Sequence, residues 1–429
     1  MGKKKNVSRR GFLKMAAAGT CGSLVHGVPF GGGLDLMKSA QAITGGAFNN
    51  LVVISQDGGA NSFNMAPTVG GQHQDNNPTS APDPDAAGAL YLNGNQMLHP
   101  AMDNIFRLIM SGEGLLINEV GYPGHSRSHG TAQRAWKTGD AAARMESDGW
   151  LNQLGCLSTS QYATVSVAGQ STIITGACPN ARAMNSLASL TQSRYRNSTG
   201  RDQAIKAAGA QFDALANAPV TDKESFITSS RTRAIQASET LETYRNQPLV
   251  DVDGNTVNFP GNLGGRLEDI ARFIIAQPVL QTIASYASIG GWDTHGNEAS
   301  RMNNLLSNVD QSIGAFERVL KGAGVWDNTL IVIATEFGRT CVENDGQGND
   351  HGKSWKAWLL GGCLRQGGVL GAPPTEAQLN PSNLQGRRVF GEYNVDYRNL
   401  FDQIMYGLMG SDVGLFPGNY DRTALNLFR

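Results

Sequence analysis

The chain has 429 residues, with 35 Lys and Arg against 36 Asp and Glu, which gives a formal net charge of −1. This length suits one large α/β domain or two fused domains, and the balanced charge argues against a nucleic-acid binder, which would carry a basic surplus. Glycine is frequent, at 53 residues, but shows no three-residue period, which excludes a collagen-like chain.

The first 42 residues have the pattern of a twin-arginine export signal. A basic start precedes SRRGFLK at residues 8–14, a mildly apolar stretch at 15–28, and AQA at 40–42, a small-x-small pattern for signal peptidase. Residues 1–42 hold seven basic side chains and one acidic one, so their removal would change the net charge from −1 to −7. We expect export to the periplasm or beyond, with the twin-arginine translocase and signal peptidase as partners, and one domain over residues 43–429.

An N-terminal membrane anchor is the alternative for this segment. Gly, Pro and His interrupt its apolar run well below the ~18–20 residues that a span needs, and no other stretch is a transmembrane candidate, so we expect no stable membrane span. Four cysteines follow residue 42. In an oxidising compartment they permit one or two disulfides among three connectivities, or they are buried free thiols: Cys156, Cys178, Cys341 and Cys363.

Short apolar runs alternate with helical patterns along the rest of the chain. We predict strands at residues 50–55, 114–120, 163–168, 279–288 and 329–334, with a further one at 358–361. Helical spacing is found at residues 100–110, 129–137 and 300–321. Residues 68–96 are rich in turn formers and are predicted as a loop or insertion, and the polar, alanine-rich residues 200–248 as a helical insertion. The alternation indicates an α/β fold whose mostly parallel sheet is covered by helices on both faces.

Polar clusters follow four of the predicted strands, directly or shortly after. They cover residues 56–62 (QDGGANS), 121–130 (GYPGHSRSHG), 290–295 (GGWDTH) and 335–352. Functional sites of parallel α/β sheets gather at the carboxyl ends of strands. Four of the six histidines after residue 42 lie in these clusters: His125, His129, His295 and His351.

Histidines beside carboxylates suit a divalent metal with nitrogen and oxygen ligands. The candidate ligands are Asp57, Asp293, His295, Glu336, Asp350 and His351. Each has a structural alternative. Asp57 can belong to a tight turn, Asp293 can cap a helix beside a surface histidine, Glu336 at a strand end can pair with Arg339, and the loop around His351 can be a solvated turn.

Ser128 is the candidate nucleophile. It stands where a helix is predicted to begin, so a capping role is the alternative. Amides at a helix N-terminus attract an anion, and a metal can activate a hydroxyl. Arg127, His129 and Arg339 would then bind the oxygens of a tetrahedral group. A Ser-His-Asp hydrolase triad is disfavoured because the chain has no GxSxG elbow.

Several segments, in order, resemble the DUF1501 family of exported bacterial proteins. They are NLVVISQDGGANSFN, HPAM, GYPGHSRSHGTAQRAW, GGWDTHGNE, TLIVIATEFGRT and NDHGKSWKAWLLGG, between about residues 48 and 400. The resemblance implies an alkaline-phosphatase-like α/β/α fold of the alkaline-phosphatase/sulfatase-like superfamily. It also implies one or two divalent ions (Zn, Mn, Mg or Ca) beside the nucleophile. By motif, Asp293, His295, Glu336 and His351 resemble metal ligands, and Ser128 takes the position of the nucleophile.

Two residues depart from the pattern that the resemblance implies. Phe337 stands where the superfamily has a histidine ligand, and Asn61 where the family has Asp; Asp293 and His295 are also closer together than in typical members. The first hypothesis is therefore an exported metal-dependent hydrolase of phosphate or sulfate esters. The second is a scaffold without catalysis that binds an anionic glycan or another exported protein.

Overall fold

The computed structural model describes residues 46–160, 162–188 and 243–429. The predicted signal peptide at 1–42 and most of the predicted helical insertion at 200–248 lie outside these residues. No helix in the described part is long and apolar enough to cross a membrane.

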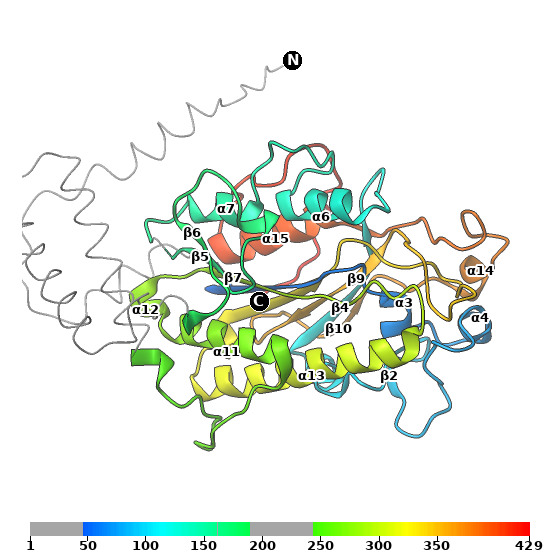
Figure 1. Cartoon of the computed structure of the whole chain (residues 1–429), viewed down its shortest axis with the longest axis horizontal. Helices are drawn as coiled ribbons and strands as arrows, with labels where there is room; N and C mark the ends of the chain where they lie inside the picture. The colour runs from blue at the N-terminus through cyan, green and yellow to red at the C-terminus, as the bar shows by residue number, and fades with distance from the viewer. Residues whose placement is uncertain (1–45, 161, 189–242) are drawn as a thin grey trace, which may run out of the picture. The chain divides into compact units, whose positions relative to one another are not determined.

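A nine-stranded sheet forms the centre of the described part (Figure 1). Its strands follow the order β10-β4-β9-β8-β1-β7-β5-β6, and β11 also pairs with β4. Their bounds are β1 Asn50–Gln56, β4 Gly114–Gly121, β5 Thr164–Ser166, β6 Ala181–Ala183, β7 Ala284–Ile289, β8 Thr329–Ala334, β9 Trp355–Leu360, β10 Gly368–Leu370 and β11 Val395–Asp396.

Strand direction brings the polar clusters to one edge of the sheet. β1 runs parallel to β7 and β8, whereas β9 runs antiparallel to both β8 and β4. It follows that β4 is parallel to β1, so β1, β4, β7 and β8 all end at the same edge, where β9 begins. The predicted α/β class with a mostly parallel sheet is confirmed.

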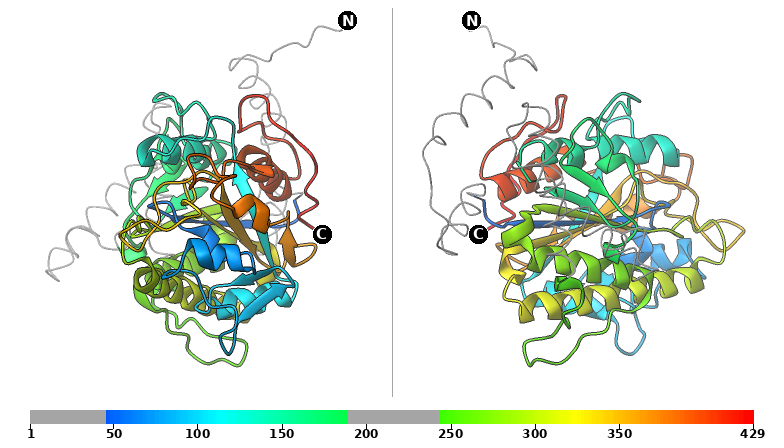
Figure 2. Two further views of the ribbon diagram at one scale, coloured as in Figure 1. Left: turned by 90° about the vertical axis from the view of Figure 1, so that its right-hand side faces the viewer. Right: turned by 60° about the vertical axis from the view of Figure 1, so that its left-hand side comes forward.

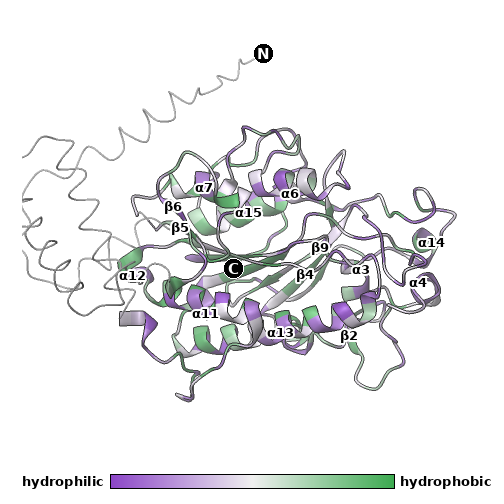
Figure 3. Ribbon diagram, in the orientation of Figure 1, coloured by the Kyte–Doolittle hydropathy of each residue, from purple (hydrophilic) through white to green (hydrophobic). Residues whose placement is uncertain are grey.

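Helices cover both faces of the sheet (Figures 1 and 2). Alternate side chains of β1 enter two separate cores, Leu51 and Val53 on one side and Val52 and Ile54 on the other. The first core is covered by α6 His129–Thr138, α7 Trp150–Gly155 and α15 Tyr397–Met409, and the second by α5 Asp103–Met110, α11 Gly261–Ile275 and α13 Glu298–Gly322. The central strand β8 is buried along its whole length and is almost entirely apolar, whereas β4 and β7 also carry buried polar residues. The covering helices carry both apolar and polar residues (Figure 3).

Two predicted segments differ from the structure. Residues 68–96 are predicted as a loop or insertion, and in the structure this region holds the short helix α4 Gly71–Asn76 and the hairpin of β2 Leu90–Asn93 and β3 Gln96–Leu98. Gly94 and Asn95 form the turn between these two strands, and a Gly-Asn pair between strands is a hairpin signal. The expected strand at 279–288 begins instead with helix α12 Gln277–Leu280, which has proline in its first turn, and only then enters β7.

The last predicted strand begins three residues earlier than expected, and the sequence did not predict that it is antiparallel. It spans Trp355–Leu360 rather than 358–361, and it is the antiparallel β9. Two short helices that the sequence pattern did not predict, α3 Ser62–Met65 and α14 Glu376–Leu379, lie together with α4 on one side of the described part (Figure 1).

One disulfide joins Cys156 and Cys178, and Cys341 and Cys363 are buried free thiols. The bridge links the end of α7 to the segment before β6. It therefore ties the outermost part of the sheet to a helix that covers one face.

Replacing Cys156 and Cys178 with Ala should lower the free energy of unfolding by about 3 kcal/mol, since a bridge spanning 22 residues restricts the unfolded chain. Urea unfolding with and without reductant measures this change. Reductant should destabilise the wild-type protein but not the double variant. Equal unfolding of the wild type under both conditions would contradict the bridge.

Candidate metal centre

Three loops at the carboxyl edge of the sheet bring charged and imidazole side chains together. Asp293 and His295 follow β7, and His129 is the first residue of α6, which follows β4. Glu336 follows β8, and His351 precedes β9. The antiparallel direction of β9 places the residues before this strand, rather than those after it, at the same edge.

Three imidazole nitrogens converge on one carboxylate oxygen. Asp293 Oδ1 lies 3.4 Å from His129 Nε2, 3.1 Å from His295 Nε2 and 3.2 Å from His351 Nε2. The Nε2 atoms of His295 and His351 are 3.0 Å apart. His129, Asp293 and His351 form the one group of three among the described residues whose ligand atoms all lie within 4.8 Å of one another.

The opposite nitrogen of each ring has its own acceptor. His129 Nδ1 is 2.8 Å from Glu336 Oε1, and His295 Nδ1 is 2.9 Å from Asp350 Oδ1. His351 Nδ1 is 2.8 Å from the backbone oxygen of Arg127. Acceptors at Nδ1 fix the proton there and leave the lone pair on Nε2, which is the tautomer that binds a metal through Nε2.

This arrangement fits a small divalent cation. Lone pairs that face one another at 3.0–3.4 Å repel, whereas tetrahedral ligands with bonds of ~2.0–2.1 Å stand about 3.3 Å apart. His129 Nε2 is also buried without a hydrogen-bond partner among the described residues. Three imidazoles and a carboxylate are a donor set that zinc and similar ions prefer.

The protonation states of His351 and Asp293 also suit the binding of a divalent cation. Burial is the largest influence on His351 and lowers the pKa of its imidazole, which favours the neutral form that a metal requires. At Asp293, burial opposes ionisation, but the hydrogen bond and charge of Arg339 outweigh it and lower the pKa to about 2. The carboxylate is therefore ionised at neutral pH.

Arg339 holds the loops of the centre together. Its side chain is fully buried, and Nη2 donates to Asp293 Oδ1 at 2.6 Å. The guanidinium also donates to backbone oxygens of three loops: Nη2 to Gly58 and Trp292, Nε to Gly59 and Nη1 to Asn349. The sequence predicted that Arg339 would bind oxygens of the substrate; the structure instead places its guanidinium beneath Asp293.

Glu336 and Asp350, both predicted as ligands, contact ligand imidazoles instead. The Glu336 carboxylate is buried and also accepts from the backbone amide of Gly58 and from Gln133 Nε2. His129, predicted to bind substrate oxygens, presents its Nε2 to Asp293. In this arrangement the carboxylates orient the rings, and the rings offer the donor atoms.

Asp57 is turned toward α6. Its Oδ1 lies 2.9 Å from Lys137 Nζ and 2.6 Å from Ser55 Oγ. The two glycines that follow are needed where they stand, because a Cβ on Gly58 would lie 2.6 Å from the Asp293 amide and one on Gly59 would lie 2.2 Å from the ring of Phe337. This turn packs against the centre through its backbone rather than through the Asp57 carboxylate.

Ser128 occupies the N-cap position of α6, but its side chain makes no capping hydrogen bond. The residue is exposed and directly precedes His129. Its neighbour Arg127 donates from Nε to the backbone oxygen of His351 at 2.7 Å. An exposed hydroxyl and a cation therefore border the centre at the beginning of a helix.

Phe337 and Asn61, the two departures from the expected pattern, each contact neighbouring side chains around the centre. The buried ring of Phe337 lies against His129 and His351, with centroids 4.8 and 4.7 Å apart. Asn61 Nδ2 donates to Glu298 Oε1 at 2.6 Å, and Asn61 caps α3. Glu298 is not among the residues predicted to be functional; the sequence signal that marks it is its position three residues after His295, at the beginning of α13.

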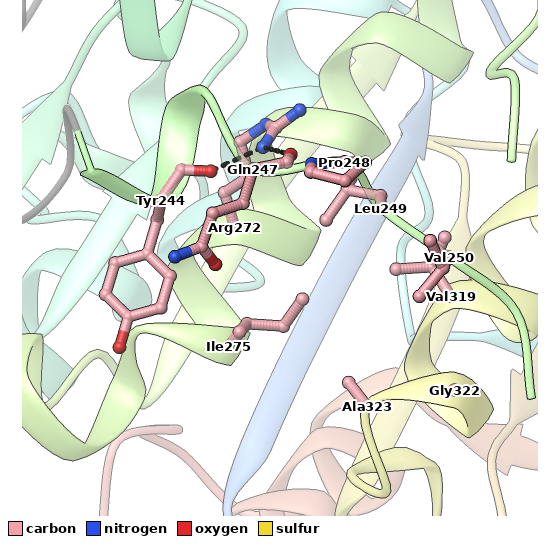
Figure 4. A pocket seen from close by; sticks show the side chains of 10 residues that line it. All are labelled: Tyr244, Gln247, Pro248, Leu249, Val250, Arg272, Ile275, Val319, Gly322 and Ala323. Carbon is pink, nitrogen blue, oxygen red and sulfur yellow. Dashed lines mark hydrogen bonds between the residues drawn. The ribbon is translucent and has the colours of Figure 1, made fainter. Parts of the chain in front are cut away.

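The cavity in Figure 4 lies elsewhere. It measures about 140 Å³ and is lined by residues of α11, of the end of α13 and of the segment 244–250. Its charged side chain, Arg272, donates to the backbone oxygens of Tyr244 and Gln247 and pairs with Glu268. This cavity therefore offers no cluster of reactive groups.

Replacing Arg339 with Met should lower the free energy of unfolding by about 3–5 kcal/mol, because four backbone oxygens and the Asp293 carboxylate would lose their donor. Urea unfolding measures the loss. The matched control is Arg301→Met, since Arg301 is exposed and makes one 3.3 Å bond to Gly291 O. A loss of equal size in both variants would show that Arg339 has no special structural role.

Three solved structures show distant similarity to the chain. They are "Ps i-CgsB in complex with k-i-k-neocarrahexaose" (12% identity, 85% of this chain and 72% of that chain, TM-score 0.38), the lipoteichoic acid synthase LtaP from Listeria monocytogenes (11%, 84% and 80%, 0.33) and the PsFucS1 sulfatase from Pseudoalteromonas sp. (14%, 85% and 72%, 0.33). These values are too low to transfer an activity or a substrate. A family model described as "Protein of unknown function (DUF1501)" matches residues 88–415. The chain belongs to the DUF1501 family.

Proposed function

We propose that the protein is an exported, metal-dependent hydrolase of phosphate or sulfate esters. The observation that carries this proposal is the convergence of three imidazole Nε2 atoms on Asp293 Oδ1, with each opposite Nδ1 held by an acceptor. His129, His295, His351 and Asp293 would hold one divalent ion. When bound, such an ion acts as a Lewis acid toward a phosphoryl or sulfuryl oxygen.

The residues around the centre suit an anionic ester. The side chain of Arg127 brings a positive charge next to His351, and the first amides of α6 favour an anion at Ser128. Ser128 would attack phosphorus or sulfur. The bond to its Oγ forms as the bond to the leaving alcohol oxygen breaks, and the hydroxyl proton passes to that oxygen. Water then cleaves the seryl ester, which releases phosphate or sulfate and restores the hydroxyl.

A second function is favoured by Phe337. Its apolar ring lies against both His129 and His351, and by the resemblance it stands where the superfamily has a histidine ligand, so a second ion would lack that ligand. A centre with one ion and no turnover would serve as a binding site for an anionic glycan or another exported protein.

Export is the other part of the proposal. The SRRGFLK motif and the AQA pattern support the twin-arginine route. The Cys156–Cys178 disulfide supports an oxidising destination, since such bridges persist outside the cytoplasm.

Replacing Ser128 with Ala should reduce turnover of aryl phosphate or aryl sulfate by roughly 10³-fold or more and should leave zinc binding unchanged. Turnover is measured with nitrophenyl esters after loading with Zn²⁺, Mn²⁺, Mg²⁺ or Ca²⁺, and zinc by elemental analysis. Thr131→Ala, which removes another exposed hydroxyl from the same helix, is the control and should retain activity. A zinc-loaded wild type that hydrolyses neither class of ester would favour the binding function.

Replacing Arg9 and Arg10 together with Lys should keep the protein in the cytoplasm in its full-length form. Cell fractionation with immunoblotting measures its distribution, and N-terminal sequencing of the exported wild type should read from Ile43. Lys4→Arg is a matched control in the same basic segment. Normal export of the double variant would rule out the twin-arginine route.

A further inference from the structure

We propose that Glu298 is a positioning residue of the metal centre and that it acts through Thr294. This inference rests on the proposed metal site but concerns a residue that binds neither metal nor substrate. Glu298 begins α13 and is fully buried. Its Oε2 accepts a hydrogen bond from Thr294 Oγ1 at 2.7 Å.

Thr294 stands between two of the proposed ligands. Because Asp293 and His295 flank it, any movement of Thr294 moves both donor atoms. Its backbone is held as well, since the amide donates to Trp292 O at 2.9 Å and the oxygen accepts from Asn349 N at 3.1 Å. The Thr294 hydroxyl is a buried side-chain contact between this turn and α13.

The Glu298 carboxylate is itself held by two amides. Its Oε1 accepts from Asn61 Nδ2 at 2.6 Å and from Asn64 Nδ2 at 2.7 Å. No Lys or Arg in the described part of the chain forms an ion pair with it, so its three hydrogen bonds must offset the cost of burying a carboxylate. The three partners are therefore tied to the carboxylate, and Thr294 is one of them.

The same residue joins a second loop of the centre. The Glu298 amide donates to Gln347 O at 2.9 Å, and Asn297 N donates to Gly346 O at 3.0 Å. This loop carries Asp350, which holds His295 Nδ1, and then His351. Glu298 thus contacts Thr294, which precedes His295, and the loop whose Asp350 carboxylate accepts from His295.

This role also explains Asn61. An amide at this position can donate to Glu298, whereas an aspartate would place two carboxylates in contact and could not donate unless protonated. Asn61 is therefore the residue that a buried Glu298 requires, independent of any direct contact with a metal.

The test compares zinc affinity of the full chain by calorimetric titration with Zn²⁺. Thr294→Val and Glu298→Ala should each weaken zinc binding about 10–100-fold, the loss expected when a ligand's supporting contact is removed. Glu298→Gln should stay within about threefold of the wild type, because its carbonyl oxygen can still accept from the two amides and its amide can donate to the threonine hydroxyl.

Asp310→Asn is the matched control. Asp310 is a second buried carboxylate of α13, and it accepts from the backbone amides of Asn104 and Ile105 at the beginning of α5. This variant should lose stability in urea unfolding but bind zinc as the wild type does. Wild-type affinity in Thr294→Val and Glu298→Ala, or an equal loss in Asp310→Asn, would overturn the positioning role.

A second readout separates this inference from the metal site. In metal-free protein, the ring resonances of His295 should shift in Thr294→Val and Glu298→Ala but not in Asp310→Asn, as followed by NMR of labelled histidines. A wild type that binds no zinc would contradict the proposed metal centre, and the metal-free resonances would still decide whether Glu298 positions His295. Unchanged His295 resonances in the first two variants would overturn the inference.

Discussion

The buried guanidinium of Arg339 is the contact on which the arrangement of the loops depends. Backbone oxygens after β1 and β7 and from the loop before β9 all accept from it, and so does the Asp293 carboxylate. Loops that run free at a sheet edge would have independent positions. The guanidinium has five donors in one rigid plane, so it holds the backbones of these loops at fixed distances from one another. The side chains of the centre, which these loops carry, are thereby fixed as well.

The three imidazoles of the centre are held by different kinds of acceptor. Glu336, which holds His129, is buried, whereas Asp350, which holds His295, is about two-fifths exposed. His351 is held by a neutral backbone oxygen. The three rings are therefore not equivalent, because their acceptors differ in charge and in exposure to solvent. The centre is fixed most firmly on its inner side and faces solvent at His295.

The sequence indicated the sheet and the location of the centre more completely than the roles within it. The apolar run TLIVIA predicted β8 to the residue, because a strand buried on both faces is a short, nearly continuous run of apolar and β-branched residues. The clustering of histidines at strand ends located the centre. The contact partner of each side chain could not be predicted, because it comes from a segment that is distant in the sequence. Glu336 binds an imidazole and Asp57 binds Lys137, and neither contact follows from the local sequence. The contact of Thr294 with Glu298 likewise depends on how α13 packs.

The direction of β9 determines how changes in one loop would affect the centre. Since β8 and β9 are antiparallel neighbours, the chain between them leaves the sheet and returns beside its own starting point. Glu336, Arg339, Asp350 and His351 all lie on this one excursion, and the pairing of Arg339 with His351 closes it further. The excursion is a hairpin, so its closure is local and costs little chain entropy. One proposed ligand, His351, and the three side chains that hold the other ligands therefore lie on a single connection, and a change in the length of this loop would displace them together.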